Sequence, residues 1–350
     1  MRVLITGVGA VAQEPRPAGD GADDAWFDPV PHLGRRGWKY FSPATRYLLA
    51  AGNEAIGRRH SDEALTGAAS ECFGVVAGTE YAIAGVHRRM YDTLRTEGVR
   101  GISPAEVPAF SMNTPASQLA ISAGARAFSV TVTNPVTAGL EAVHLAATAL
   151  RTGRADRVVA AATDQAPPGV EGLGHDAAAA VLLTADSTDS ADSTDSAGGP
   201  VGGSAGGSCE GALALAEITG GVSRFVPVDA DGRWNPVALA LGARRIAALA
   251  AGVEGSESTT RPRLVVSAPA SAHEFAVAVR EAVGDALDTP GSDVRDRHTE
   301  VQEARHCAVS GLLELVTLAK SGESALVVSV SGSGRLTAIA LGNASRPEFH

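Results

Sequence analysis

The chain contains few side chains that could act as nucleophiles or metal ligands. Its cysteines, Cys72, Cys209 and Cys307, are widely spaced, and they form no Cys-x-x-Cys pair. This spacing indicates neither a disulfide framework nor a zinc site. Cys72 opens an apolar segment, where a buried thiol is usually inert. Cys307 follows His306, and adjacent residues on a helix point apart. We therefore favour a structural interpretation of both thiols over a nucleophilic one.

Two pairs of residues could carry out acid-base chemistry. Glu141 and His144 are three positions apart in an apolar segment, and that spacing would place them on one face of a helix. Proton transfer by this pair is one interpretation, but a hydrogen bond between them or to a partner chain is the interpretation that we favour. His175 and Asp176 come directly before an apolar run and are most simply a turn.

A glycine-rich segment near the start resembles a dinucleotide-binding loop. Residues 7–12 read GVGAVA, which is close to GxGxxA. A nucleotide site needs a helix directly after these glycines, so that the helix N-terminus faces the pyrophosphate. Pro15 and Pro17 follow instead. The segment therefore predicts a strand and a turn, and no bound cofactor.

Composition limits the partners of the chain. The 350 residues are 45% apolar and only 4% aromatic, and the net charge is −10. An acidic chain without a strongly basic cluster is unsuited to nucleic acid or an anionic membrane. The start, MRVLITGVGA, lacks a signal sequence, and no apolar run approaches the roughly 18 residues of a membrane span. We expect a cytoplasmic protein without a metal.

The segment from Val130 to Asp164 predicts the central unit of the fold. Alternating Val130 and Val132 indicate a strand, and the segment from Asn134 to Gly153 has one narrow polar stripe on an otherwise apolar helix. Residues 157–162 (RVVAAA) are typical of a strand buried on both faces. A shorter copy of this pattern occupies residues 310–330, which predicts a duplicated architecture.

The remaining pattern predicts two αβ halves joined by a linker. Residues 186–208 (DSTDSADSTDSAGGPVGGSAGGS) have low complexity and little to bury, so we expect a disordered linker between halves 1–185 and 209–345. Apolar and capping patterns predict the following additional elements: strands near residues 2–6, 72–79, 175–183, 213–218, 264–268 and 336–341, and helices near residues 41–58, 81–97, 113–123, 236–251 and 272–286.

Several motifs resemble those of the β-ketoacyl synthase family. The resemblance covers most of the chain and rests on these segments: residues 130–140 and 153–156, similar to the nucleophile turn, its helix and the GRAD that follows, residues 117–121 and 216–220, and the glycine-rich 331–334. It implies a thiolase-like αβαβα fold of five layers built from two similar halves.

The same resemblance identifies positions where the chemistry of the family would reside. Decarboxylative condensation needs a thiolate at a helix N-terminus and two imidazoles. Counting along the motifs places Val136 at the nucleophile, Pro269 at the first histidine and Arg305 at the second, with His306 one place away. Valine cannot carry an acyl group. A thiol beside an imidazole at the inner end of the pocket would contradict this non-catalytic interpretation.

Loss of these groups resembles the chain-length factor of type II polyketide synthases, the inactive partner of the ketosynthase subunit. Arg305 matches that family, whereas Val136 departs from its usual glutamine, and the short connection from Asp164 to Asp176 lacks room for the usual mobile loop. The resemblance implies a heterodimer with an active ketosynthase α subunit, formed around residues 130–151. Its substrate would be presented on the phosphopantetheine of an acyl carrier protein.

Chain-length factors close the acyl tunnel with residues that correspond here to Ala84, His87 and Tyr91, and the alternative is that these side chains only pack the core. Arg35, Arg36 and Lys39 form a local basic group that suits a carrier protein, although a solvated loop is the interpretation that we favour. A second hypothesis is a stand-alone ketosynthase-fold acyltransferase with a relocated nucleophile or base such as Cys72 or His306.

Overall fold

The computed structural model describes residues 1–14, 26–167, 174–186, 213–253, 262–287 and 299–344. Of the expected linker, 186–208, residues 187–208 lie outside the described residues, so the boundaries between the halves stay a prediction. Within the described part of the chain, no helix is both long and apolar enough to cross a membrane.

The described strands form one mixed sheet, in which the order is β3-β2-β4-β5-β1-β6-β10-β9-β7-β8. The strands of the first half are β1 (Arg2–Ala12), β2 (Phe73–Gly78), β3 (Phe128–Val132), β4 (Arg157–Asp164) and β5 (Ala177–Asp186). Those of the second half are β6 (Ala216–Phe225), β7 (Arg263–Ala268), β8 (Thr299–Glu303), β9 (Ala325–Val330) and β10 (Arg335–Asn343).

The two halves repeat the same strand pairing. β2 is parallel to β3 and β4, as β7 is to β8 and β9. β5 is antiparallel to β4 and β1, as β10 is to β9 and β6. The halves meet where Leu4 and Ile5 of β1 pair with β6. This correspondence confirms the duplicated architecture, and it includes β8, which the sequence pattern had not predicted.

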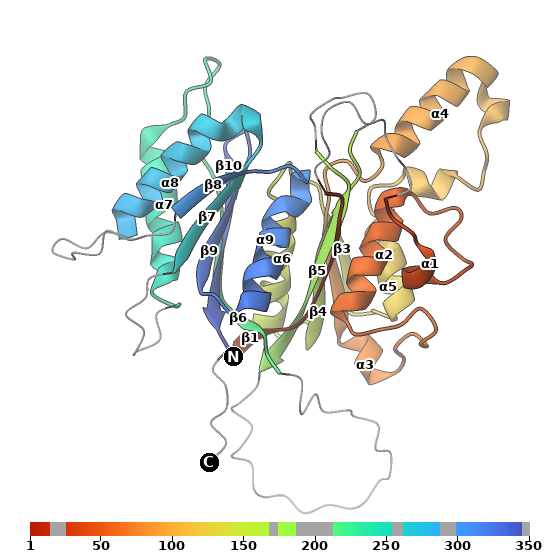
Figure 1. The fold of residues 1–350 in the computed structure, drawn as a ribbon, viewed down its shortest axis with the longest axis horizontal. Helices are drawn as coiled ribbons and strands as arrows, with labels where there is room; N and C mark the ends of the chain where they lie inside the picture. The colour runs from red at the N-terminus through yellow and green to blue at the C-terminus, as the bar shows by residue number, and fades with distance from the viewer. Residues whose placement is uncertain (15–25, 168–173, 187–212, 254–261, 288–298, 345–350) are drawn as a thin grey trace, which may run out of the picture.

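Helices divide the molecule into five layers (Figure 1). α2 (Pro43–Ala55) and α5 (Thr114–Ala123) cover the outside of the first half, and α7 (Pro236–Ala250) and α8 (His273–Leu287) cover the outside of the second. α6 (Ala138–Arg151) and α9 (Ser310–Ser321) lie between the two halves of the sheet. Three apolar clusters fill the spaces between these layers. The expected αβαβα fold is therefore confirmed.

The two central helices approach closely because each carries a glycine at the contact. A Cβ added to Gly139 would lie 2.4 Å from the carbonyl oxygen of Ala308, and one added to Gly311 would lie 3.0 Å from Leu140. Protein atoms do not tolerate the shorter of these separations. The Gly-Leu pair that the two sequence copies share is therefore the point where their helices meet.

The start of the chain differs from the expected strand and turn. Residues 7–12 continue β1, and no helix follows them directly. Gly7 and Gly9 are needed because a Cβ at either position would lie within 2.2 Å of a backbone oxygen of α2. Their role is close packing against a helix, which excludes the dinucleotide-loop geometry.

Several shorter or projecting elements complete the described fold. α4 (Ala84–Glu97) begins three residues later than expected and projects from the body of the molecule (Figure 1). The others are α1 (Val30–Leu33), α3 (Ala68–Glu71) and the 3-10 turns η1 (Val99–Gly101), η2 (Val107–Phe110), η3 (Ala270–Ala272) and η4 (Cys307–Val309).

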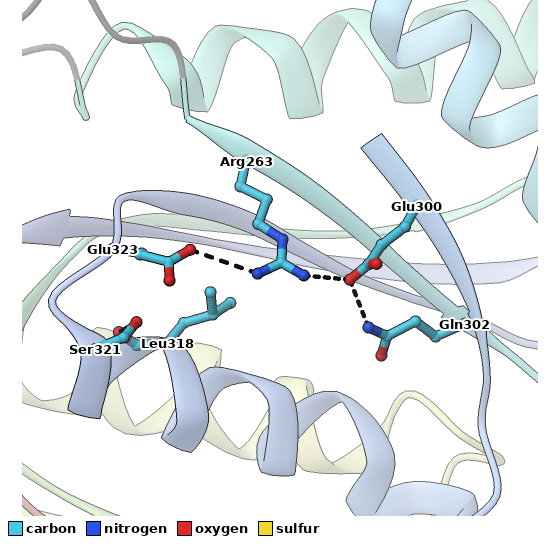
Figure 2. A network of polar contacts seen from close by, with 6 residues as sticks. All are labelled: Arg263, Glu300, Gln302, Leu318, Ser321 and Glu323. Atoms are coloured by element: carbon cyan, nitrogen blue, oxygen red, sulfur yellow. Dashed lines mark hydrogen bonds and ion pairs between the residues drawn. The ribbon is translucent and has the colours of Figure 1, made fainter. Parts of the chain in front are cut away.

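The edge strand β8 is attached by a polar network as well as by its ladder. Figure 2 shows the Arg263 guanidinium between Glu300 of β8, at 2.6 Å, and Glu323, at 3.4 Å. Gln302 donates a hydrogen bond to Glu300 from the same strand. These side chains are partly exposed, so solvent weakens the ion pairs to about 1 kcal/mol or less each. The network orients β8 more than it stabilises the fold.

Candidate functional site

A cavity of about 730 Å³ opens where the two halves meet. Val136, Pro269 and Arg305, which are 133 and 36 residues apart in sequence, all line it. The loop of Ser331, Gly332 and Ser333 between β9 and β10 forms another part of its wall. The structure thus brings together the three positions that the sequence motifs had singled out, and the glycine-rich loop with them.

Val136 occupies a strained turn at the start of α6. Its φ is 60°, in the left-handed region that a β-branched residue rarely adopts, and its side chain is buried. The Val136 backbone N–H donates a hydrogen bond to Glu80 Oε2 over 3.1 Å. The N-terminus of a helix carries partial positive charge and unpaired N–H groups. A carboxylate from the chain itself therefore lies against the turn that leads into the N-terminus of α6.

Asp164 at the end of β4 holds the loop that carries Glu80. Its Oδ1 accepts hydrogen bonds from Thr79 Oγ1 (2.9 Å), Glu80 N (2.8 Å) and Tyr81 N (2.6 Å). Its Oδ2 accepts one from Ala308 N (3.0 Å) in the second half. Complete burial raises the pKa of Asp164 to about 7, although these four donors oppose the shift. Asp164 therefore connects the two halves directly behind the cavity.

Cys307 is the second-half counterpart of Val136. It has a φ of 50°, precedes α9 as Val136 precedes α6, and lines the same cavity, as does His175. The cavity thus holds a thiol and an imidazole, the combination named above as contrary to a non-catalytic interpretation, but no hydrogen bond joins Cys307 to His175. Burial, followed by the charges of Asp164 and Glu80, instead raises the pKa of Cys307. This environment keeps the thiol protonated, whereas a nucleophilic cysteine needs a lowered pKa.

Arg305, and not His306, faces the cavity. The Arg305 Nε pairs with Glu303 over 3.1 Å at the cavity wall. The His306 Nε2 lies 3.1 Å from the carbonyl oxygen of Gln13, and burial lowers the pKa of this imidazole. Shifting the motif alignment by one residue, from Arg305 to His306, would therefore not place an imidazole in this cavity.

Glu80, Asp164 and Cys307 also offer one ligand atom each within 4.8 Å of one another. Sequence spacing could not reveal this cluster, because its members come from three separate segments: the loop after β2, the end of β4 and the start of η4. The oxygens of Asp164 already accept four protein hydrogen bonds, so the cluster is explained without an ion.

Ala84, His87 and Tyr91 do not line this cavity. They lie on α4, in which only Gly85 and Val86 are buried. The His87 ring packs against Phe110 with 4.2 Å between centroids, and Tyr91 is 57% exposed. The alternative that these residues pack the core is wrong for His87 and Tyr91, while their place in a tunnel stays a prediction about an assembly with a partner.

The other candidate residues have structural surroundings. Glu141 accepts hydrogen bonds from Thr137 and Asn134, and Thr337 of β10 donates over 3.4 Å, so the expected bond between Glu141 and His144 is wrong, while a bond from this pair to a partner chain stays a prediction. The expectation that Cys72 is buried is also wrong. It is exposed and lies away from the cavity, and Asp156 raises the pKa of its thiol.

The two residues predicted to form a turn, His175 and Asp176, have different surroundings. Asp176 accepts a hydrogen bond from the Tyr47 hydroxyl over 2.7 Å, whereas His175 lines the cavity. Arg35, Arg36 and Lys39 are exposed on a loop.

The fold and the cavity define a ketosynthase-like member of the thiolase fold. The N-terminal domain of β-ketoacyl synthases ("Beta-ketoacyl synthase, N-terminal domain") matches residues 18–210, more than half of the chain. The chain belongs to the β-ketoacyl synthase family. A comparison with curated protein sequences returns no match.

Solved structures agree with this assignment at the level of the fold. The ishigamide ketosynthase/chain length factor has a TM-score of 0.66 and 19% identity over 98% of this chain and 99% of that one. The structure of a type II PKS acyl-carrier protein in complex with its ketosynthase has a TM-score of 0.69 and 18% sequence identity, over 98% of this chain and 99% of that chain. An oxazolomycin ketosynthase domain of Streptomyces albus has a TM-score of 0.64 and 13% sequence identity, over 100% of this chain and 76% of that chain.

Proposed function

We propose that the chain is a non-catalytic chain-length factor. It pairs with an active ketosynthase, and the joint tunnel limits how far a polyketide or polyene chain grows on an acyl carrier protein. The chain holds no cofactor of its own, and the phosphopantetheine of the carrier protein presents the substrate. We place it in the cytoplasm.

One observation carries this proposal: the residue at the start of α6 is a valine whose backbone N–H is already bonded to Glu80. A valine cannot form an acyl-enzyme, and a carboxylate at this N–H repels the negative charge of a thioester oxyanion. Arg305 and Pro269 stand in the same cavity where the chemistry of the family needs imidazoles. The named structural neighbours, a ketosynthase/chain length factor and a ketosynthase with its carrier protein, support the choice of partners.

The proposed partner surface is the segment from β3 to α6, together with α4. β3 is an edge strand of the sheet, and an unpaired strand edge is suited to pairing with another chain. Leu145 of α6 is 43% exposed, and Tyr91 and Leu94 of α4 are 57% and 45% exposed. A partner ketosynthase covering these side chains would place α4 beside its own acyl cavity.

The experiment compares the chain alone with the chain co-expressed with a ketosynthase α subunit. Intact-protein mass spectrometry after incubation with acyl-carrier substrates should show acylation of the ketosynthase and none of this chain. Size-exclusion chromatography should show a heterodimer, and the chain alone should aggregate because its apolar partner surface is uncovered. Acylation of this chain in the absence of a partner would refute the proposal.

The alternative function is a stand-alone acyltransferase with a relocated nucleophile. Cys307 is the thiol of the described residues that lines the cavity, so it replaces Cys72 as the candidate to test. If the chain alone becomes acylated and Cys307→Ser abolishes that acylation while Cys72→Ser does not, the alternative is correct.

A further inference from the structure

Glu80 contacts the start of α6 in a way that ordinary packing does not require. Its Oε2 accepts the hydrogen bond of the Val136 N–H, while its backbone N–H is fixed by Asp164. Glu80 also lines the cavity beside Val136 and Tyr81. A neutral side chain could fill the same space. A carboxylate adds a full negative charge at the point where a helix N-terminus would otherwise favour an anion from outside.

We propose that Glu80 is an internal anion that silences this cavity independently of Val136. Its carboxylate takes up the Val136 N–H donor, which could otherwise polarise the carbonyl oxygen of a substrate. Its negative charge also opposes the formation of a thiolate at position 136. The inference rests on the proposed function only in treating the cavity as the acyl site of the family. It predicts that a thiol restored at position 136 would still be poorly reactive.

The charges around position 136 favour this role. At Cys307, the counterpart of Val136, burial is the main cause of the raised pKa, and the charges of Asp164 and then Glu80 add to it. The other carboxylates nearby are Asp164, which is occupied by four donors, and Glu303, which is paired with Arg305. Glu80 is thus the carboxylate whose partner is the N–H of position 136 itself.

The test measures the pKa of a thiol introduced at position 136. The background is the chain with Cys72, Cys209 and Cys307 changed to serine, so that Val136→Cys supplies the single thiol. The rate of alkylation by iodoacetamide is followed from about pH 5 to pH 10, and circular dichroism confirms that each variant folds. Cysteine should tolerate the positive φ at least as well as the β-branched valine does.

Val136→Cys alone should titrate at or above the ordinary thiol pKa of about 8.5. Adding Glu80→Gln removes the charge but keeps an oxygen that can accept from the backbone N–H. The thiol pKa should then fall by at least about one unit, which increases the thiolate fraction at neutral pH roughly tenfold. The matched control is Glu303→Gln, a carboxylate in the same cavity that is paired with Arg305. It should leave the thiol pKa within a few tenths of a unit.

Two results would overturn the inference. One is a thiol pKa well below the ordinary value in the Val136→Cys variant with Glu80 intact, because Glu80 would then not oppose thiolate formation. The other is an equal shift in the Glu80→Gln and Glu303→Gln variants, which would indicate general charge rather than a specific contact. Neither result bears on whether the natural chain forms an acyl-enzyme, so failure here is distinct from failure of the proposed function.

Discussion

Removing the Asp164 side chain should destabilise the protein strongly in mildly acidic solution. Asp164→Ala leaves four donors without their acceptor: the Thr79 hydroxyl and the backbone N–H groups of Glu80, Tyr81 and Ala308. At about 1 kcal/mol for each donor left unpaired, the free energy of unfolding should fall by about 4 kcal/mol at pH 5. This is a large part of the stability of a typical domain.

The destabilisation should become smaller as pH rises. Burial raises the folded-state pKa of Asp164 from 3.8 to about 7, so the folded protein binds this proton more tightly than the unfolded chain does. Stability from this group is therefore complete below about pH 4 and is lost as pH rises toward 7. Between pH 5 and pH 8 the wild-type protein loses about 3 kcal/mol through this group, a loss that Asp164→Ala avoids. The difference between them should narrow to about 1 kcal/mol.

Urea denaturation at pH 5 and pH 8, followed by circular dichroism, measures the free energy of unfolding of the wild type and of Asp164→Ala. The contributions of other titrating groups are nearly the same in both proteins, so they largely cancel in the difference between the two free energies. Asp156→Ala is the control, because Asp156 is exposed and a surface substitution changes stability by no more than about 0.5 kcal/mol. A cost below about 1 kcal/mol at pH 5, or a cost that increases between pH 5 and pH 8, would refute this account of Asp164.

Three other predictions concern the helix contact, a buried carboxyl and the tunnel. Gly139→Ala should lower the free energy of unfolding by about 2–3 kcal/mol, because the added Cβ would lie 2.4 Å from the Ala308 oxygen, whereas Gly332→Ala, with its nearest atom 3.9 Å away, should unfold like the wild type in urea. Burial raises the pKa of Glu314, so Glu314→Gln should gain thermal stability relative to wild type as pH rises from 4 to 7, and a loss would contradict this. In the proposed complex, Tyr91→Ala should lengthen the product measured by mass spectrometry, and unchanged length would remove Tyr91 from the tunnel floor.

The central segments were predictable because their local and tertiary preferences agree. The helix ending before Gly153 and the strand from Arg157 are strongly apolar, and burial on both sides is the environment such sequences require. β3 was predictable instead from the alternation of Val130 and Val132, which suits a partly buried edge strand. Ser42 caps α2 by accepting from Thr45 N over 3.2 Å, as its sequence indicated. β8 could not be predicted, because TEVQE has no apolar periodicity and becomes a strand through its neighbour β7.

The sequence alone determined the duplicated halves, the valine at the start of α6 and the arginine at position 305, since motif spacing along the chain is sufficient to count them. Only the tertiary structure decided that Glu80 contacts Val136, that Asp164 connects the halves, and that Cys307 rather than His306 enters the cavity. The physical reason is that these contacts join loops far apart in sequence. Their relation depends on how the layers pack, which no local pattern encodes.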